Sequence, residues 1–381
     1  MQTAASLDRM KSSFIREILA AASDPDMISL AGGLPDEKTF PIELLKPTIA
    51  QLHNDVSLFQ YGPTQGYAPL VKHLNQLYQL PEHHKLLVTT GSQQGLDLIA
   101  RAYINPGDGV AMEAPSYLGA MQVFDFVQAS ILPVAQLADG PDFEALERCF
   151  ANDKPKLFYA VPDFHNPTGV CWSLATRQAV AKLCIEYGVT LLEDAPYRPL
   201  RFSGEALPMV SNFCPDQALV LRSFSKIASP GLRIGVVSGP AQWIEPLIKV
   251  KQGADLHSNV PAQAMLLGLL EHPEFEQHIA KVCDLYHGRY QVLLKALEQL
   301  EPFGCQAQPV AGGMFVWLTL PDCDSFALAK YLIEQGVATV PSDVFYSVEK
   351  GVSALRLNFT NATPDMLQEA VSRMAQVFST L

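Results

Sequence analysis

The sequence predicts an α/β protein with a large domain, built on a three-layer, mostly parallel sheet, and a smaller α+β domain. The first observation is an alternation between residues 85 and 237, where short apolar segments are separated by amphipathic helical segments. Such alternation is typical of parallel strands covered by helices on both faces. The second is that the alternation ends near residue 240. The third is a chain of 381 residues, 48% of them hydrophobic, which is enough for more than one core.

Each strand of the large domain is predicted from a short apolar run, and each helix from apolar residues spaced three or four positions apart. The predicted strands span 86–91, 109–113, 131–134, 156–161, 190–193, 218–221 and 234–237. The helices between them span 92–103, 116–127, 143–150 and 173–187. Nearer the N-terminus, helices are expected over 7–22, 41–52 and 68–78, with an extended segment at 28–35.

The smaller domain is predicted from the change of pattern after residue 240. Helices are expected over 242–254, 262–270, 275–300, 325–335 and 364–380, and strands over 314–320 and 355–359. The long helix that begins near Phe275 is a plausible bridge between the two units. We therefore expect a large domain over 45–270, and a small domain formed by 1–44, with an N-terminal arm, and 271–381.

Composition excludes several classes of function. The net charge of −12 argues against a surface for nucleic acid or an anionic membrane. The seven cysteines are scattered and odd in number, so neither a disulfide framework nor a zinc site is indicated. No apolar run reaches membrane-spanning length, and charges interrupt the N-terminal segment where a signal peptide needs its apolar core. The expected location is the reducing cytoplasm.

Polar residues follow several predicted strands, at the edge where open parallel sheets bind ligands. Each of them has an ordinary structural explanation: a helix N-cap, a turn, or a surface lysine in a loop. Together, however, they would place an anion-binding helix start, an amide, a carboxylate, a phenol, a lysine and an arginine at one edge. These residues are Ser92, Gln93, Asn166, Asp194, Tyr197, Ser223, Ser225, Lys226 and Arg233.

One ligand that needs this whole set is pyridoxal 5'-phosphate. Its aldehyde requires an amine such as Lys226, which burial would keep neutral and nucleophilic. Its ring nitrogen requires a carboxylate such as Asp194, and its phenolate oxygen requires donors such as Asn166 and Tyr197. Its phosphate suits a helix start, serine hydroxyls and an arginine such as Arg233.

The chain resembles the fold-type-I pyridoxal-phosphate enzymes of the class I and II aminotransferase family, whose fold is that of aspartate aminotransferase. The most specific motif is Ser223-Phe-Ser-Lys226 followed by Pro230-Gly-Leu-Arg233, and the similarity extends from residues 28–35 to 355–359. The nearest subgroup contains 2-aminoadipate, kynurenine-type and aromatic or branched-chain aminotransferases, together with the aminotransferase-like domains of MocR-type regulators.

The resemblance implies a role for each of these residues. Lys226 would form the Schiff base and move the proton, Asp194 would pair with the pyridine nitrogen, and Asn166 and Tyr197 would hold the phenolate oxygen. The remaining implied cofactor contacts are phosphate ligands, a stacked ring, and a phosphate ligand donated by the neighbouring subunit of a homodimer with shared active sites. These are Ser92, Gln93, Ser223, Ser225 and Arg233 for the phosphate, Tyr117 for the stack and Tyr61 for the donated ligand.

For the substrate, the resemblance implies that Arg356 binds the α-carboxylate and that Gly33 offers its backbone N–H to the same group. Asn166 would also face the substrate. Arg16 lies on the first helix, where some relatives use an arginine to read an acidic side chain; a solvated helix-face charge is the alternative. Two departures from the subgroup are visible, His165 before Asn166 and a missing glycine in the segment 341–346, and both could alter the substrate pocket.

The implied reaction is transfer of an amino group from an L-amino acid to a 2-oxo acid, with 2-oxoglutarate the expected acceptor. A β-lyase, decarboxylase or synthase of the same fold is the first alternative, because the sequence does not show which Cα bond would break. The second is a non-catalytic regulatory domain that senses the cofactor. Such regulators carry a winged-helix segment first, and the short stretch before residue 28 and the acidic charge argue against DNA binding.

Overall fold

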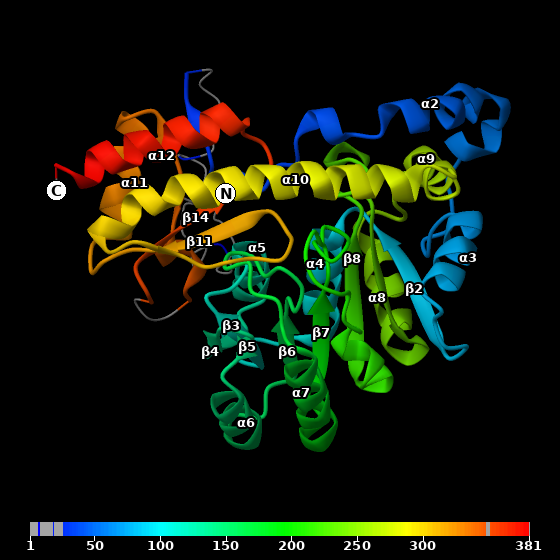
Figure 1. Ribbon diagram of the computed structural model, residues 1–381. Coiled ribbons are helices and arrows are strands. Elements are labelled where there is room, and N and C mark those ends of the chain that lie inside the picture. The colour runs from blue at the N-terminus through cyan, green and yellow to red at the C-terminus, as the bar shows by residue number, and fades with distance from the viewer. Residues whose placement is uncertain (1–6, 8–17, 19–25, 348–350, 381) are drawn as a thin grey trace, which may run out of the picture.

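The computed structural model describes residues 7, 18, 26–347 and 351–380. The predicted helix over 7–22, including Arg16, lies outside the described residues apart from Leu7 and Ile18. Within the described part of the chain, the strands form one sheet of eight strands, one of four and one of two. The molecule has a sheet-rich body and a second lobe that contains β1 and the C-terminal elements, and the long helix α10 crosses from one to the other (Figure 1).

The large sheet is a mixed sheet whose centre is parallel. Its strand order is β2-β9-β8-β7-β6-β3-β4-β5. The pairs from β8 through β7, β6 and β3 to β4 are parallel, whereas β9 runs antiparallel to both β2 and β8. The strands are β2 (His84–Thr89), β3 (Gly109–Ala114), β4 (Ser130–Leu137), β5 (Gly140–Pro141), β6 (Leu157–Ala160), β7 (Thr190–Asp194), β8 (Ala218–Ser223) and β9 (Gly235–Pro240).

Helices cover both faces of this sheet, because successive strand residues point to opposite sides. Leu157 and Tyr159 of β6 join the core that contains α4, α5 and α8. Phe158 and Ala160 join a separate core under α6 and α7. A third core packs β2 and β9 against α3 and α9. The helices are α2 (Ile42–Gln51), α3 (Ala68–Leu77), α4 (Ser92–Tyr103), α5 (Leu118–Phe126), α6 (Phe143–Asn152), α7 (Leu174–Tyr187), α8 (Ala241–Ala254) and α9 (Val260–Leu270).

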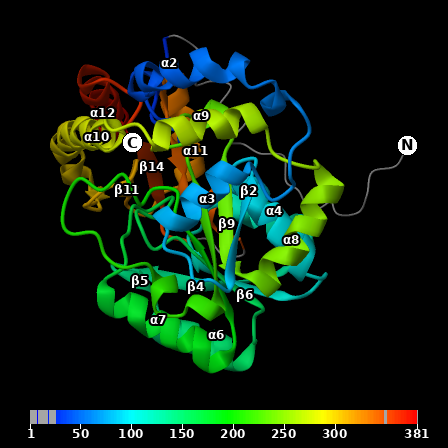
Figure 2. The ribbon, with the colours of Figure 1, turned by 90° about the vertical axis from the view of Figure 1, so that its right-hand side faces the viewer.

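The second lobe holds the four-stranded sheet β10-β11-β14-β13, which is antiparallel throughout. Strand β1 (Ile28–Ser29) pairs in parallel with β12 (Val337–Ala338), so the N-terminal segment lies in this lobe. Figure 2 shows α10 and α12 side by side over these strands. The other elements are β10 (Gln306–Ala307), β11 (Phe315–Thr319), β13 (Val340–Pro341), β14 (Ala354–Asn358), α10 (Phe275–Leu297), α11 (Ser325–Glu334) and α12 (Pro364–Phe378).

The α/β class and the mostly parallel sheet are confirmed by this topology, and most predicted bounds agree within a few residues. The short strands β5, β10, β12 and β13 were not predicted, because runs of two residues have no readable period. The domain boundaries at residues 44 and 270 stay a prediction. None of the described helices is both long and apolar enough to cross a membrane.

Candidate active site

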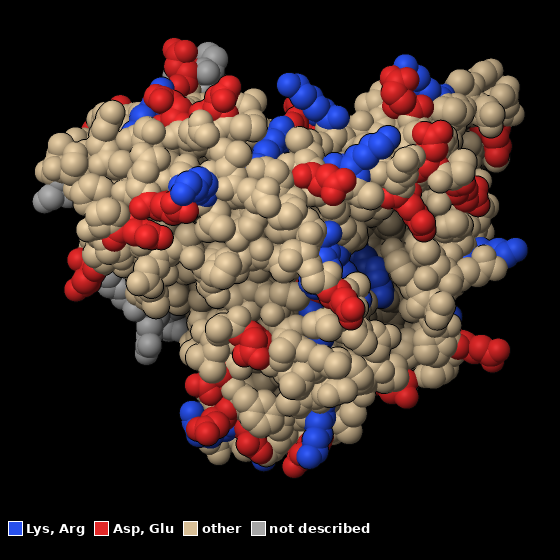
Figure 3. Space-filling model, viewed as in Figure 1, with Lys and Arg blue, Asp and Glu red and all other residues tan. Residues whose placement is uncertain are grey.

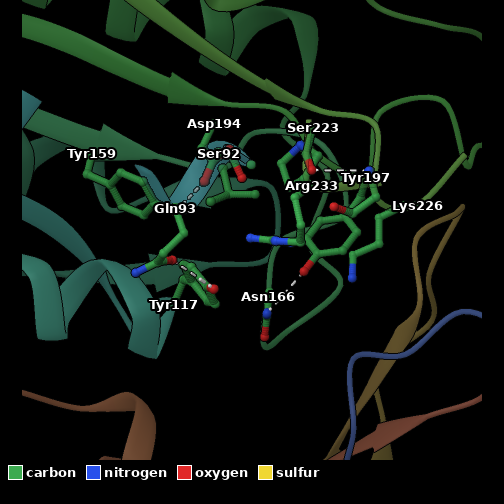
Figure 4. Close-up of a pocket in the computed structure, with 14 residues that line it drawn as sticks. Ser92, Gln93, Tyr117, Tyr159, Asn166, Asp194, Tyr197, Ser223, Lys226 and Arg233 are labelled. Atoms are coloured by element: carbon green, nitrogen blue, oxygen red, sulfur yellow. Dashed lines mark hydrogen bonds between the residues drawn. The ribbon is translucent and has the colours of Figure 1, made fainter. Parts of the chain in front are cut away.

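A cavity lies at the carboxyl ends of β2, β6, β7 and β8, where the sequence predicts a ligand site. Acidic side chains are spread over the face shown in Figure 3, and Lys and Arg side chains line a hollow near its centre. The cavity is small and its wall is rich in polar groups (Figure 4). It is lined by Gly91, Ser92, Gln93, Tyr117, Tyr159, Val161, Asn166, Asp194, Pro196, Tyr197, Ser223, Ser225, Lys226 and Arg233.

One corner of the cavity is built to bind an anion. Gly91, rather than Ser92, is the N-cap of α4, and its φ of 79° lies in the left-handed region that favours glycine. A Cβ there would lie 2.6 Å from Nη2 of Arg233, so the guanidinium packs directly on this turn. Within the described residues, Arg233 makes two hydrogen bonds, both long at 3.5 Å, to the carbonyls of Pro230 and Thr90. A helix N-terminus and an arginine with spare donors therefore face the same space.

Asp194 ends β7 in the wall of the cavity and is buried. Its Oδ2 accepts a hydrogen bond of 2.8 Å from the Tyr159 hydroxyl, whereas its Oδ1 is buried and has no partner among the described residues. Burial raises the pKa of Asp194 to about 7, although the bond from Tyr159 acts in the opposite direction. An unpaired buried carboxylate oxygen is costly. A cationic N–H donor in the cavity would satisfy it.

Asn166 joins two other predicted site residues. Its Nδ2 donates to the Tyr197 hydroxyl at 3.1 Å, and its Oδ1 accepts from Nη1 of Arg356 at 2.8 Å. Burial raises the pKa of Tyr197 above its usual value, so the phenol keeps its proton. Because the phenolic oxygen accepts from Asn166, its own proton can be donated to an oxygen in the cavity (Figure 4).

Lys226 follows β8 and projects into the cavity. Its Nζ donates a hydrogen bond of 2.8 Å to the backbone carbonyl of Gly33. Burial, followed by the positive charges of Arg356 and Arg233, lowers the pKa of Lys226 to about 8. Near neutral pH a substantial fraction of this amine is therefore unprotonated, which is the state that a nucleophile or a general base requires.

Arg356 lies in β14 and reaches the edge of the cavity from the second lobe. Its guanidinium is buried, stacks 4.3 Å from the ring centroid of Phe315, and donates through Nη2 to the carbonyl of Ala31 at 2.5 Å. Its Nε is buried and finds no hydrogen-bond partner within the part of the chain that the structure describes. A planar fork with an unused donor suits a carboxylate. Gly33 lies close by, and a Cβ at this position would be 3.2 Å from the Phe315 ring.

A second buried pair of titratable groups lies behind Asn166. His165 does not line the cavity, and its Nε2 is 3.8 Å from Oε2 of Glu113. That oxygen has no hydrogen-bond partner among residues 26–347 and 351–380, whereas Oε1 of Glu113 accepts from Gln136 at 2.9 Å. Burial raises the pKa of Glu113 to about 7 and lowers that of His165 to about 3. His165, which differs from the residue usual in the subgroup, therefore places a neutral imidazole directly before Asn166 in the same loop.

The other predicted residues divide into those in the cavity and those outside it. Tyr117, the N-cap of α5, lines the cavity and donates to Oε1 of Gln93 at 3.2 Å. Ser223 accepts through its hydroxyl from the backbone N–H of Ser225 at 3.3 Å, and both line the cavity. Tyr61 is 79% exposed and is not part of the cavity of its own chain. Arg16 lies outside the described residues.

Tyr159 is the residue that sequence reasoning missed. It lies in the middle of β6, opposite Leu192 of β7, and its side chain reaches Asp194. A tyrosine in an otherwise apolar strand, Leu157–Ala160, was the available signal, because a buried phenol needs a hydrogen-bond partner. Phe315 was missed as well, since nothing local indicates that it packs against Arg356.

These residues fit pyridoxal phosphate. The unpaired Oδ1 of Asp194 matches a protonated ring nitrogen, and the α4 start with Arg233 matches a phosphate. The paired Asn166 and Tyr197 match the ring oxygen, and Lys226 offers an amine of lowered pKa to the aldehyde. Four parts of this one ligand would thus meet complementary groups in a single cavity.

Comparisons with known proteins agree with this geometry. The family model described as aminotransferase class I and II matches residues 25–374. Aromatic-amino-acid aminotransferase 1 of Thermococcus litoralis is 34% identical, over 96% of this chain and 91% of that protein. The 2-aminoadipate transaminase of Thermus thermophilus is also 34% identical, over 98% of this chain and 95% of its own length.

Among solved structures, the α-aminoadipate aminotransferase of Thermus thermophilus, in a complex with N-(5'-phosphopyridoxyl)-L-leucine, superposes with a TM-score of 0.92. It is 33% identical, and the match covers 99% of this chain and 97% of that one. The chain therefore belongs to the class I and II aminotransferase family, and it is a transaminase that depends on pyridoxal phosphate.

Proposed function

We propose that this transaminase moves the amino group of an L-amino acid to a 2-oxo acid, with 2-oxoglutarate as the acceptor, and that Lys226 transfers the proton. The single observation that supports this most is one cavity holding the Lys226 amine, with its lowered pKa, and the unpaired Oδ1 of Asp194. When bound, pyridoxal phosphate supplies an aldehyde that condenses with amines and a ring that takes up electron density from the substrate α-carbon.

Lys226 acts as the base through its Nζ. At an ordinary pKa near 10.4, only about one lysine in a thousand is neutral at pH 7.5. With a pKa of about 8, roughly one in four is neutral at that pH. The hydrogen bond from Nζ to the Gly33 carbonyl keeps the amine near the loop where Gly33 and Arg356 would receive a substrate. The same Nζ can remove a proton from one carbon and return it to another.

Asp194 and its partner Tyr159 orient and charge the ring site. The Tyr159 hydroxyl holds Oδ2, which leaves Oδ1 directed to a ligand. A positive N–H at Oδ1 would keep Asp194 ionised, because an opposite charge offsets the effect of burial on its pKa. On the other side of the cavity, Asn166 and Tyr197 form one hydrogen-bonded unit that can hold the ring oxygen.

Arg356 would bind the α-carboxylate that amino acids and 2-oxo acids share. Its contact with Asn166 links the carboxylate site to the ring site, so both substrates would be placed by the same pair of side chains. Gly33 supports this role because its backbone comes close to Lys226 and Phe315, where a larger residue would be crowded. The relatives act, by name, on aromatic amino acids and on 2-aminoadipate, which makes both classes the first donors to test.

A homodimer would complete the site through Tyr61. This side chain is almost fully exposed on its own chain, and it follows the short helix Val56–Phe59, whose Val56 and Phe59 are exposed too. Exposed large apolar side chains in one segment support a contact with a second copy of the chain. Mixing Lys226→Ala with Tyr61→Ala protein should restore activity, because one site of each mixed dimer would then hold both native residues. No recovery would contradict a shared site.

The proposed reaction is tested by separating its two halves. The purified holoenzyme is mixed with one amino acid and no acceptor, and the visible absorbance of the bound cofactor is followed. We expect the absorbance to fall with a preferred donor and to return when 2-oxoglutarate is added. Release of ammonia and a keto acid without an acceptor would instead identify a lyase. A Lys226→Ala variant that still completed both halves would contradict the role of Lys226.

A further inference from the structure

A cluster of possible metal ligands lies at the opposite end of the large sheet from the cavity. His83 precedes β2, His84 is its first residue, and Asp216 lies in the short helix Pro215–Gln217 just before β8. Both β2 and β8 run antiparallel to β9, so they start at the same end of the sheet. The six residues of strand β8 lie between this helix and the cavity, and they span roughly 20 Å.

We propose that His83, His84 and Asp216 form a binding site for one divalent transition-metal ion of the zinc type. Nε2 of His83 is 2.6 Å, and Nε2 of His84 3.3 Å, from the same oxygen, Oδ1 of Asp216. One ligand atom from each residue lies within 4.8 Å of the others, and within the described residues this is the one group of its kind. Imidazole nitrogens with a carboxylate oxygen are a ligand set for zinc, copper or nickel.

The spacing fits an ion with little movement. Zinc bonds of about 2.0–2.1 Å in a tetrahedron place neighbouring ligand atoms about 3.3 Å apart. The His84–Asp216 distance already has this value. The His83–Asp216 distance is that of a hydrogen bond, so the exposed His83 ring would have to move away from Asp216 to make room for the ion. The fourth position would be left to water.

The ligands are held in place by the surrounding backbone. The His84 side chain is only 6% exposed, and His84 pairs with Pro240 of β9. The His83 carbonyl accepts a hydrogen bond from the backbone N–H of Ala241. The His83 and His84 rings pack edge to face, with their centroids 4.7 Å apart. Asp216, by contrast, is 73% exposed, so an ion can enter from solvent. A buried, fixed imidazole beside an open carboxylate is a partly preformed site.

An ion at this position would join the start of β2 to the turn before β8, across the intervening strand β9. It would touch no residue that lines the cavity. We therefore expect the ion to raise thermal stability and to leave transamination unchanged. An ion at 100 times its dissociation constant should raise the Tm of a chain of this size by roughly 3 °C.

The site is tested by zinc titration of the untagged holoenzyme, with magnesium as a comparison. We expect one zinc ion per chain by calorimetry and equilibrium dialysis, an unchanged cofactor spectrum, and no binding of magnesium, which prefers oxygen ligands. His84→Ala and Asp216→Asn should each weaken zinc binding by at least the roughly 10- to 100-fold that loss of an outer-sphere partner costs. Their transaminase activity should match that of the native chain.

His53→Ala is the matched control, because His53 is also exposed but lies in a short helix, Leu52–Asn54, outside the cluster. This variant should bind zinc as the native chain does. The proposal is overturned if the native protein binds no zinc. It is also overturned if Asp216→Asn and His84→Ala both bind zinc as tightly as the native protein does. If the zinc-free His84→Ala protein has a lower Tm than the native protein, the result for Asp216→Asn decides the test. That substitution leaves the fold intact, because it puts an exposed amide of the same shape in place of the carboxylate.

Discussion

Replacing Arg356 by lysine should separate its hydrogen-bonding geometry from its charge. The guanidinium is buried, stacks on Phe315, donates to Asn166 at 2.8 Å, and keeps an unpaired Nε. Lysine keeps the positive charge but cannot present a planar fork, so at least one charge-assisted hydrogen bond to the substrate carboxylate is lost. Such a bond contributes about 1.5–3 kcal/mol, which corresponds to a fall in kcat/KM of roughly 10- to 150-fold.

The assay compares kcat/KM for an amino acid with kcat/KM for the amine that lacks its carboxylate. Arg356→Lys should lower the first strongly and the second little, and the cofactor spectrum should stay that of the native enzyme. Arg101→Lys is the matched control, because Arg101 pairs with Asp97 on the exposed surface of α4. An equal fall for both substrates, or no fall for either, would refute carboxylate binding by Arg356.

Three further predictions concern buried ionisable groups. Asp194→Asn should weaken binding of pyridoxal phosphate to the dialysed apoprotein by about 10-fold, because a neutral amide makes a weaker hydrogen bond to a charged ring; unchanged affinity in an absorbance titration would contradict this. The kcat of the native enzyme should rise with pH through about pH 8, because kcat reports the complex with substrate, in which the Lys226 amine is released and can lose its proton; a flat profile would argue against that base. Because burial raises the pKa of Glu113 to about 7, the folded chain holds a proton between pH 4.5 and 7 that the unfolded chain releases, so stability from this group falls as pH rises. The Tm of Glu113→Gln minus that of the native protein should therefore be larger at pH 8 than at pH 5. Melting curves with the same difference at both pH values would contradict a raised pKa for Glu113.

The sequence was enough to predict which polar residues would lie together wherever they follow strands. Ser92, Asn166, Asp194 and Lys226 each follow or end an apolar run, and parallel strands bring such ends to one edge. The local pattern was therefore enough to gather them. Their roles in holding the cofactor remain predictions that the geometry supports.

Contacts between distant segments could not be read from local pattern. The pairing of Asn166 with Arg356 spans 190 positions, and the bond from Arg356 to Ala31 spans 325. Both depend on how the second lobe docks against the large sheet. The sequence pattern also could not predict that β9 lies antiparallel between β2 and β8, because an apolar run predicts a strand but not its direction.

Tyr159 illustrates the same limit at one residue. Its strand was predicted, but its contact with Asp194 depends on the register of β6 against β7, which brings Tyr159 opposite Leu192. A shift of one position would have turned the phenol to the other face of the sheet. Register is fixed by packing of the whole sheet, and so the partner of Asp194 became visible only in the structure.

The central claim, that Lys226 is the residue that joins the cofactor, has one direct test. The holoenzyme is reduced with borohydride, digested, and its peptides are sequenced by mass spectrometry. We expect a phosphopyridoxyl group on the ε-nitrogen of Lys226 and no label after reduction of the Lys226→Ala protein. A label on another lysine, such as the buried Lys251, or no label in the native enzyme, would contradict the account.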